Sequence, residues 1–164
     1  MGSIAEIKKV FADADISEYS GLIEKYGDDE RDGVKKIIAS AQKKINALEK
    51  EKARSYKMFE FERKYADKGY ICGIDEAGRG PFAGPVVAGA VVLPKDSRIL
   101  YVNDSKKLSE KKREALYDVI MNEAVSVGVG IVGPERIDEI NILNATYEAM
   151  HLSLIHISEP TRRR

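Results

Sequence analysis

Apolar side chains recur at three- and four-residue steps through the first part of the chain, with Lys and Glu between them. The longest such run comprises Val34, Ile37, Ile38, Ala41, Ile45 and Leu48. Because this spacing places one apolar stripe along a helix, it predicts a long amphipathic helix that continues to about Tyr65. Shorter runs predict helices around residues 4–12 and 18–26. The first part of the chain is therefore predicted to form a small helical hairpin or bundle.

From residue 70 onward the pattern changes to short apolar segments that alternate with helix-like ones. Apolar runs at residues 70–75, 86–93 and 125–132 predict strands. Helices are predicted after Ser109, a good N-cap residue, and after Pro134, which suits a first helical turn. The positions expected to face inward are Ala115, Leu116, Val119, Ile120 and Ala124 in the first helix, and Ile137, Ile140, Ala145 and Met150 in the second.

The order of these elements predicts an α/β domain. The connection between the first two predicted strands, residues 81–85, is short and contains Gly and Pro, so it predicts an antiparallel hairpin. Residues 1–69 are rich in Lys, Glu, Asp and Ala, whereas Gly, Pro and Val become frequent beyond them. We therefore expect a small all-helical N-terminal extension over residues 1–69 and an α/β domain over residues 70–151.

The last part of the chain, residues 152–164, differs from what precedes it. Its helical pattern ends abruptly at residues 158–161, which three arginines follow, and no further strand is predicted. The stretch 152–162 resembles translated adapter or vector sequence. We expect residues 152–164 to be non-native, and the α/β domain to be cut short with three strands facing two helices.

Charge and cysteine content narrow the functional classes. Lys plus Arg and Asp plus Glu both number 27, so no global positive field attracts the protein to nucleic acid, and a polyanion site has to be a local cluster. The single cysteine, Cys72, cannot form an internal disulfide, and we interpret it as a buried strand thiol in a reducing cytoplasm. We expect neither secretion nor membrane insertion, because we find no signal-like segment and no apolar stretch of membrane-spanning length.

The segment 75–81 (DEAGRGP) carries the main candidate chemistry. Asp75 and Glu76 are adjacent on a strand, so they converge on one site only if the backbone twists or bulges there. Two neighbouring carboxylates repel, and a divalent cation, a raised pKa or full solvation stabilises them. By itself such a pair is more often a solvated turn. Gly78 and Gly80 permit close approach to the backbone, and Arg79 can meet a phosphate. A P-loop fails on spacing, and a dinucleotide-binding fingerprint fails because its third glycine and its helix are missing.

A second cluster, residues 103–113, holds the strongest local positive patch. Its cations are Lys106, Lys107, Lys111, Lys112 and Arg113. Ser105 and Lys106 could hold a backbone phosphate at the mouth of the sheet. Taken by itself this patch is more often a solvated helix start. Asp104 is more simply a turn residue or ion-pair partner than a metal ligand.

Taken in order, residues 73–81 (GIDEAGRGP), 83–88 (AGPVVA) and 103–108 (NDSKKL) resemble the start of bacterial ribonuclease HII. The similarity continues through residues 128–132 and ends near Met150, so it covers about residues 70–151. The related ribonuclease HIII carries Lys and Asp where this chain has Arg79 and Pro81, which favours type HII. The helical segment before residue 70 looks like the extension found in some bacterial members.

The resemblance implies a ribonuclease H-like fold, with a mixed sheet flanked by helices, here incomplete. It implies two-metal catalysis by Mg²⁺ or Mn²⁺ held by four carboxylates, with Asp75 and Glu76 as the first two ligands. Gly78, Arg79 and Gly80 would match the loop that recognises the 2′-hydroxyl at an RNA–DNA junction, mainly through backbone atoms. Ser105 and Lys106 would match phosphate-contacting positions.

The expected function is therefore endonucleolytic hydrolysis of RNA in RNA–DNA hybrids and of ribonucleotides embedded in DNA. The family's remaining carboxylates lie beyond the matching region, and Glu135, Asp138 and Glu139 correspond to none of them. We therefore expect this chain to bind the cation weakly and to be inactive. The alternative is a non-catalytic nucleic-acid-binding module that uses the patch from Lys106 to Arg113.

Overall fold

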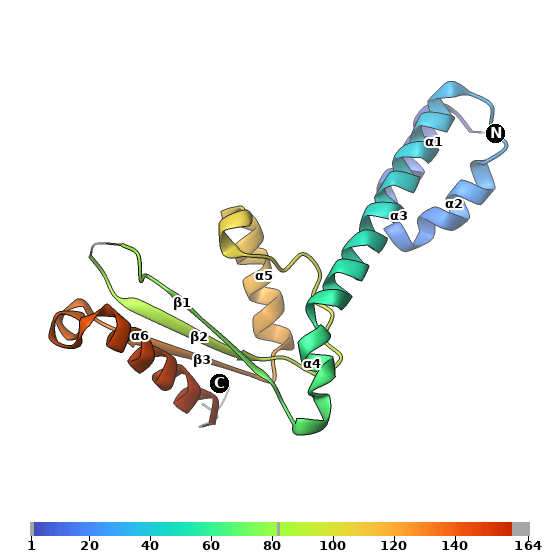
Figure 1. Cartoon of the computed structure of the whole chain (residues 1–164). Coiled ribbons are helices and arrows are strands. Elements are labelled where there is room, and N and C mark those ends of the chain that lie inside the picture. The colour runs from blue at the N-terminus through green and yellow to red at the C-terminus, as the bar shows by residue number, and fades with distance from the viewer. Residues whose placement is uncertain (1, 82, 159–164) are drawn as a thin grey trace. The chain divides into compact units, whose positions relative to one another are not determined.

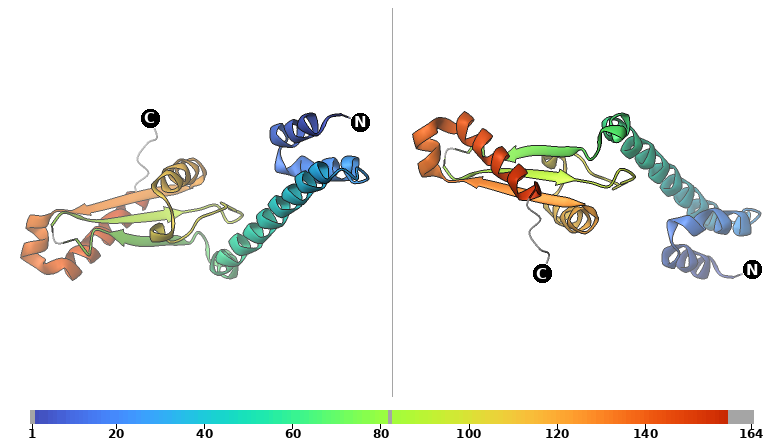
Figure 2. Two further views of the ribbon diagram at one scale, coloured as in Figure 1. Left: turned by 90° about the horizontal axis from the view of Figure 1, so that it is seen from above. Right: turned by 90° about the horizontal axis from the view of Figure 1, so that it is seen from below.

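The protein is described by a computed structural model that covers residues 2–81 and 83–158 (Figures 1 and 2). The chain divides into two compact units, Met1–Lys57 and Met58–Arg164. The first is all-helical and the second combines a sheet with helices. The predicted α/β class preceded by a helical segment is therefore confirmed. None of the described helices is both long enough and apolar enough to cross a membrane.

The first unit is built from helices α1 (Ile4–Asp13), α2 (Tyr19–Tyr26) and α3 (Asp32–Met58), with a short 3-10 turn at Ile16–Glu18. Helix α1 begins with a capping box. The Ser3 hydroxyl accepts a hydrogen bond from the Glu6 backbone N–H (3.2 Å), and the Glu6 carboxylate accepts one from the Ser3 N–H (2.6 Å). The helices expected around residues 4–12 and 18–26 are thus present.

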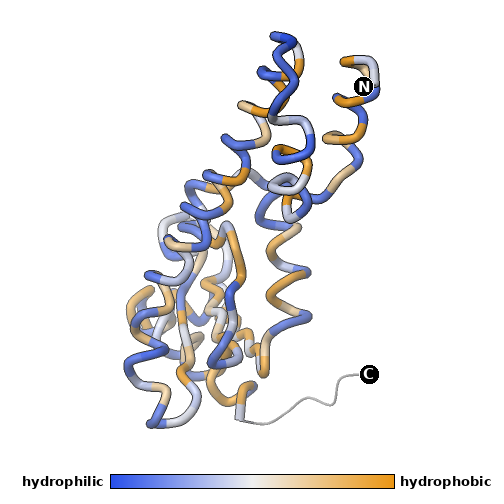
Figure 3. Tube along the Cα trace, turned by 90° about the vertical axis from the view of Figure 1, so that its right-hand side faces the viewer, coloured by the Kyte–Doolittle hydropathy of each residue, from blue (hydrophilic) through white to orange (hydrophobic). Residues whose placement is uncertain are grey.

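The core of this unit lies among the three helices. Its buried members are Ile7, Phe11, Tyr19, Val34 and Ala41. The Tyr19 hydroxyl donates a hydrogen bond to the Phe11 carbonyl (3.0 Å), and the two rings pack edge to face with centroids 5.7 Å apart. The buried Tyr19 hydroxyl therefore has a hydrogen-bond partner while the ring fills the core. Apolar and polar positions alternate along the helical coils, as Figure 3 shows in orange and blue.

An ion pair fixes the entry into α3. The Arg31 guanidinium contacts the buried Asp29 carboxylate at 2.6 Å and also donates to the Gly2 carbonyl (3.1 Å). Hydrogen bonds from Arg31 hold the pKa of Asp29 below its ordinary value. The loop before α3 is therefore tied to the start of the chain.

The prediction that the long helix continues to about Tyr65 is wrong. Helix α3 ends at Met58, because Phe59 takes ψ 21° and leaves the helical hydrogen-bond ladder. A separate short helix, α4 (Glu60–Lys64), and a 3-10 turn at Ala66–Lys68 follow. The Phe61 and Tyr65 rings pack together with centroids 4.6 Å apart. This ring contact lies within the short helix after the break, so helical spacing of aromatic residues does not show where α3 ends.

The second unit contains a three-stranded sheet of order β1-β2-β3, formed by Cys72–Ala77, Val86–Val92 and Ser126–Val132. The central strand β2 pairs antiparallel with β1 on one side and with β3 on the other. The hairpin expected between the first two strands is confirmed by their regular pairing from Cys72–Val92 to Ala77–Val87. Cys72 lies on strand β1 as predicted, but it is half-buried rather than buried, and desolvation raises the pKa of its thiol.

Helix α6 (Pro134–Ser158) packs on one face of this sheet (Figure 1). The side chains of β2 alternate, and the buried set is Val86, Ala88, Ala90 and Val92. On β3, Gly128 and Gly130 allow the helix backbone to approach. A Cβ at either glycine would overlap a carbonyl oxygen of α6, that of Ser153 or Ala149. Glycine is therefore required at both positions by helix–sheet packing.

Helix α6 is bent near its start. Asn141 has φ 68° and ψ 162°, which is not helical. Its side-chain oxygen accepts hydrogen bonds from the N–H groups of Leu143 (3.0 Å) and Asn144 (3.1 Å), so it caps a new helical segment. The inward positions predicted for this helix are confirmed, with Ala145 buried and Ile137, Ile140 and Met150 packed against the same cluster.

The other face of the sheet is more open. Val129 and Ile131 on β3 keep 45% and 60% of their surface exposed. Helix α5 (Glu110–Glu123) begins after Ser109, as predicted, but the Ser109 side chain makes no capping hydrogen bond. The prediction that α5 buries a continuous apolar face is wrong for the described residues. Of its five predicted members only Ala124 is buried, while Leu116 and Ile120 are half-buried and Ala115 and Val119 are exposed.

The close contact between β3 and α6 makes a testable prediction. Gly130→Ala should lower the free energy of unfolding by about 1–3 kcal/mol, because the new methyl group forces the helix away from the sheet. The matched control is Gly89→Ala on β2, where a Cβ meets nothing within 4 Å. Urea unfolding followed by circular dichroism measures both variants. Equal losses in the two would contradict this account of the packing.

Candidate functional site

The two adjacent carboxylates lie on the edge strand β1. Asp75 pairs with Gly89 and Glu76 with Ala88, and the pairing is regular through both positions. Directly paired residues of an antiparallel ladder share a face, so Glu76 lies on the side of the buried Ala88 and Asp75 on the open side. No bulge brings the two side chains together within β1. The bulge that sequence reasoning allowed for is therefore absent at this position.

The surroundings of the two carboxylates differ accordingly. Asp75 is exposed, and its Oδ1 accepts a hydrogen bond from the Glu76 backbone N–H (2.9 Å). The Glu76 side chain is 23% exposed, and its Oε1 accepts a hydrogen bond from the Arg79 guanidinium (3.4 Å). Arg79, itself half-exposed, thus folds back from the turn toward the strand. In the first candidate motif, residues 75–81, Arg79 therefore pairs with Glu76 and leaves Asp75 without a cationic partner among the ion pairs of the described residues.

Gly78 and Gly80 of this motif differ in the space around them. Gly78 has φ 85°, and a Cβ there would overlap the Pro85 carbonyl oxygen. The close approach of the two sides of the hairpin therefore requires glycine at position 78, whether or not a ligand binds there. A Cβ at Gly80 would meet nothing within 4 Å. Close approach of a ligand at Gly80 stays a prediction, and this position has the open space that it needs.

The second motif forms a 3-10 turn at Ser105–Lys107, directly before α5. The Asp104 carboxylate accepts a hydrogen bond from the Lys106 backbone N–H (2.9 Å). The prediction that Asp104 acts as a turn residue is confirmed. Ser105 and Lys106 are both exposed on this turn. The turn thus presents a hydroxyl and an ammonium group to solvent on a backbone fixed by Asp104.

Arg113 has a role that sequence reasoning missed. Its guanidinium donates to the carbonyls of Leu108 (2.7 Å) and Ser105 (3.3 Å), so it ties the first turn of α5 to the motif before it. In the sequence it looked like one more cation of the patch. A signal was present, because a cation near a helix N-terminus is unfavourable and calls for a specific partner. Arg113 therefore positions Ser105 rather than only adding charge.

Each motif is held by hydrogen bonds of its own: Glu76 bonds with Arg79 of its hairpin, and Arg113 bonds with the turn before α5. Carboxylate oxygens are the ligands that Mg²⁺ and Mn²⁺ prefer, so Asp75 and Glu76 fit part of such a site by the chemistry of their donors. Over residues 2–81 and 83–158, no group of three or more His, Cys, Asp or Glu side chains is arranged to hold a metal ion. The metal-binding role of the two carboxylates stays a prediction.

Comparisons with known proteins identify both parts of the chain. A family model described as "Ribonuclease HII N-terminal domain" matches residues 3–66, and one described as "Ribonuclease HII" matches residues 72–159. Proteins named ribonuclease HII are similar over 90%, 90% and 79% of this chain. The one from Lachnoclostridium phytofermentans is 56% identical, that from Clostridioides difficile 51% and that from Bacillus cereus 52%. The matched region spans 58%, 59% and 51% of these relatives.

The two hydrogen bonds of Arg113 make a second testable prediction. Arg113→Met should speed amide hydrogen exchange at Lys107 and Leu108 by about tenfold, because losing a charged donor to these carbonyls costs on the order of 1.4 kcal/mol. Exchange measured by NMR on the labelled chain tests this. Lys112→Met is the control, since it removes a neighbouring charge but no such hydrogen bond. Similar exchange rates in both variants would exclude the positioning role.

Proposed function

This chain belongs to the ribonuclease HII family of hydrolases, and from this premise we propose that it represents an endonuclease acting on RNA in RNA–DNA hybrids and on ribonucleotides embedded in DNA. The observation that carries the proposal is the Asp75–Glu76 pair on β1, followed directly by the Gly78–Gly80 turn. An acidic pair beside a turn open to a phosphodiester backbone suits metal-assisted hydrolysis. The substrate class rests on the family.

In this proposal Asp75 and Glu76 are the catalytic, metal-binding residues, and Mn²⁺ or Mg²⁺ is the cofactor. Bound ions would activate the attacking water and stabilise the leaving oxygen. The contrasting surroundings of the two acids support a division of labour. Asp75 lies exposed on the open face, where a substrate can reach it, whereas Arg79 holds the half-buried Glu76 near the turn.

The remaining site residues would bind the nucleic acid. Gly78, Arg79 and Gly80 would recognise the 2′-hydroxyl of the ribonucleotide, largely through backbone atoms. Support comes from the space around Gly80 and from the half-exposed Arg79 guanidinium. Ser105 and Lys106 would hold a backbone phosphate, which the exposure of both side chains permits.

For the organisation of the chain we keep the division into a helical extension (1–69), the first part of the catalytic domain (70–151) and a non-native tail (152–164). Within the tail, residues 152–158 form the end of α6, where the Ser153 backbone packs on Gly128, and 159–164 lie outside the described residues. Two of the family's four carboxylates are matched here. We therefore propose that this chain alone binds the cation weakly and cleaves poorly.

A non-catalytic nucleic-acid-binding module is the second candidate. The exposed turn at Ser105–Lys107 and the basic residues that follow it in α5 favour it, since a cluster of cations binds any polyanion. Such a module would bind every duplex alike and without metal. Binding that requires Mn²⁺ or Mg²⁺ and prefers an RNA–DNA junction would instead favour the nuclease.

Cleavage of a duplex that holds one ribonucleotide tests the proposal. The proteins compared are this chain and a chimera in which residues 1–151 continue into the downstream part of the Lachnoclostridium phytofermentans relative. With Mn²⁺ or Mg²⁺ the chimera should cut at the ribonucleotide. Asp75→Asn in the chimera should reduce the rate by more than the roughly 10- to 100-fold loss typical of residues outside the metal's own ligands.

The control for this experiment is Asp138→Asn, which removes an exposed acid of α6 that corresponds to no family ligand. Its rate should stay within about twofold of the parent chimera, as for surface changes remote from a site. A chimera whose cleavage survives Asp75→Asn would refute the assignment of Asp75. If the chain by itself cuts through Asp75, only the proposal that it cleaves poorly is wrong.

A further inference from the structure

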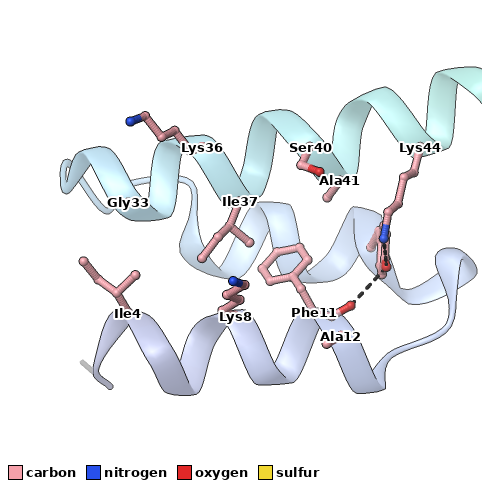
Figure 4. Close-up of a pocket in the computed structure, with 11 residues that line it drawn as sticks. Ile4, Lys8, Phe11, Ala12, Gly33, Lys36, Ile37, Ser40, Ala41 and Lys44 are labelled. Atoms are coloured by element: carbon pink, nitrogen blue, oxygen red, sulfur yellow. Dashed lines mark hydrogen bonds between the residues drawn. The ribbon is translucent and has the colours of Figure 1, made fainter.

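A groove with a volume of about 450 Å³ runs between α1 and α3 of the first unit (Figure 4). Neither of the two candidate motifs contributes to it. Its lining residues come from both helices and from Tyr19, the first residue of α2.

The charge of the groove is one-sided. Lys8, Lys36 and Lys44 line it and no Asp or Glu does, although acidic and basic residues are nearly balanced over residues 1–57. The Lys44 ammonium donates to the Tyr19 hydroxyl (3.2 Å) and lies over its ring, so it is fixed in place. Lys8 and Lys36 are exposed, and neither takes part in an ion pair of the described chain. The groove therefore offers an uncompensated positive rim.

Between the lysines the surface is apolar. Phe11, Ala41 and the half-buried Ile37 form the floor, and Ile4 stands at one end with 40% of its surface exposed. Gly33 closes that end, because a Cβ there would lie 2.9 Å from the Ile4 side chain. A ligand would thus bury aliphatic groups while facing positive charge at the rim.

The shape of the groove favours a helical ligand. The lining positions repeat at three- and four-residue steps on both helices, and Figure 4 shows α1 and α3 running in the same direction. From Ile4 to Ala12 the groove is about 12 Å long, or roughly two helical turns. Two parallel helices with matched spacing form a trough into which the apolar face of a third can pack.

A nucleic acid fits this surface less well. Binding of single strands uses exposed aromatic rings for base stacking, but Phe11 and Tyr19 are only 5% and 4% exposed. A duplex backbone would use the lysines and leave the apolar floor uncovered. The combination of an apolar trough and a basic rim matches a ligand that is both apolar and acidic.

We propose that this groove is a docking site for an acidic amphipathic helix of a partner protein. Leucine-like side chains four residues apart would enter the trough over Ile37, and Glu or Asp on either side would face Lys8 and Lys36. The proposal does not depend on the nuclease function, because none of the residues proposed for catalysis or substrate binding lines the groove.

The test uses a fluorescently labelled peptide of about 14 residues built from Glu, Ala and Leu, with leucines four residues apart on one face. Its affinity for the whole chain is measured by fluorescence anisotropy. Reversing the rim with Lys8→Glu and Lys36→Glu together should weaken binding at least about tenfold. The matched control is Lys9→Glu with Lys35→Glu, which reverses exposed neighbours outside the groove and should change the affinity by less than about twofold.

A second pair of variants tests the apolar trough. Ser40→Leu fills the groove and should weaken binding, whereas Ala39→Leu adds the same side chain beside it and should not. Circular dichroism of each variant confirms that the helices remain folded. Peptides with Leu replaced by Ser, or with Glu replaced by Lys, should bind at least about tenfold more weakly.

Several results would overturn the proposal. One is failure of the Glu and Leu peptide to bind. Others are equal losses in the groove and control variants, or undiminished binding of the peptide that lacks leucine or glutamate. If an RNA–DNA duplex displaces the peptide and loses affinity on reversal of Lys8 and Lys36, the groove is a nucleic-acid surface instead.

Discussion

The packing of α6 against two glycines of β3 is the contact on which the α/β unit depends. Gly128 and Gly130 bring the helix backbone so close that no side chain fits between them. This contact buries one face of the sheet, including every second residue of β2. The register between β1 and β2 then determines which face of the sheet each β1 side chain lies on. The glycines of β3 thus indirectly determine the faces on which Asp75 and Glu76 lie.

That register explains why two adjacent acids have different surroundings. Asp75 lies on the open face and is exposed, whereas Glu76 lies on the covered side and meets Arg79. In a flat strand their carboxylates would stay on opposite sides of the sheet. Because β1 is regular at these residues, any convergence on a common ion has to come from strand twist and from side-chain rotation at the edge. An edge strand, with one neighbour only, leaves room for both.

The sequence predicted the strands, the hairpin and the helix after Pro134, because their signals are local: apolar runs, turn residues and helix-compatible starts. It did not predict the end of α3 at Met58 or the bend at Asn141, since each depends on the backbone of one residue within a continuing pattern. Among the site residues, the sequence indicated the turn role of Asp104. The place of Arg113 near a helix N-terminus indicated a partner without identifying it. An arginine that donates to backbone carbonyls cannot be distinguished in sequence from one that binds a phosphate.

The chain has two basic surfaces although its net charge is zero: the patch after Ser105 and the α1–α3 groove. The lysines alone do not show which ligand each surface binds. The patch after Ser105 lies on a turn and a helix start, so its attraction for a polyanion is mostly Coulombic and falls steeply with added salt. The lysines of the α1–α3 groove surround an apolar floor, so part of any binding there comes from burying aliphatic surface, which salt does not screen. Salt dependence would therefore distinguish the two surfaces. Two clusters with similar numbers of lysines can therefore bind different ligands, because only one of them surrounds an apolar surface.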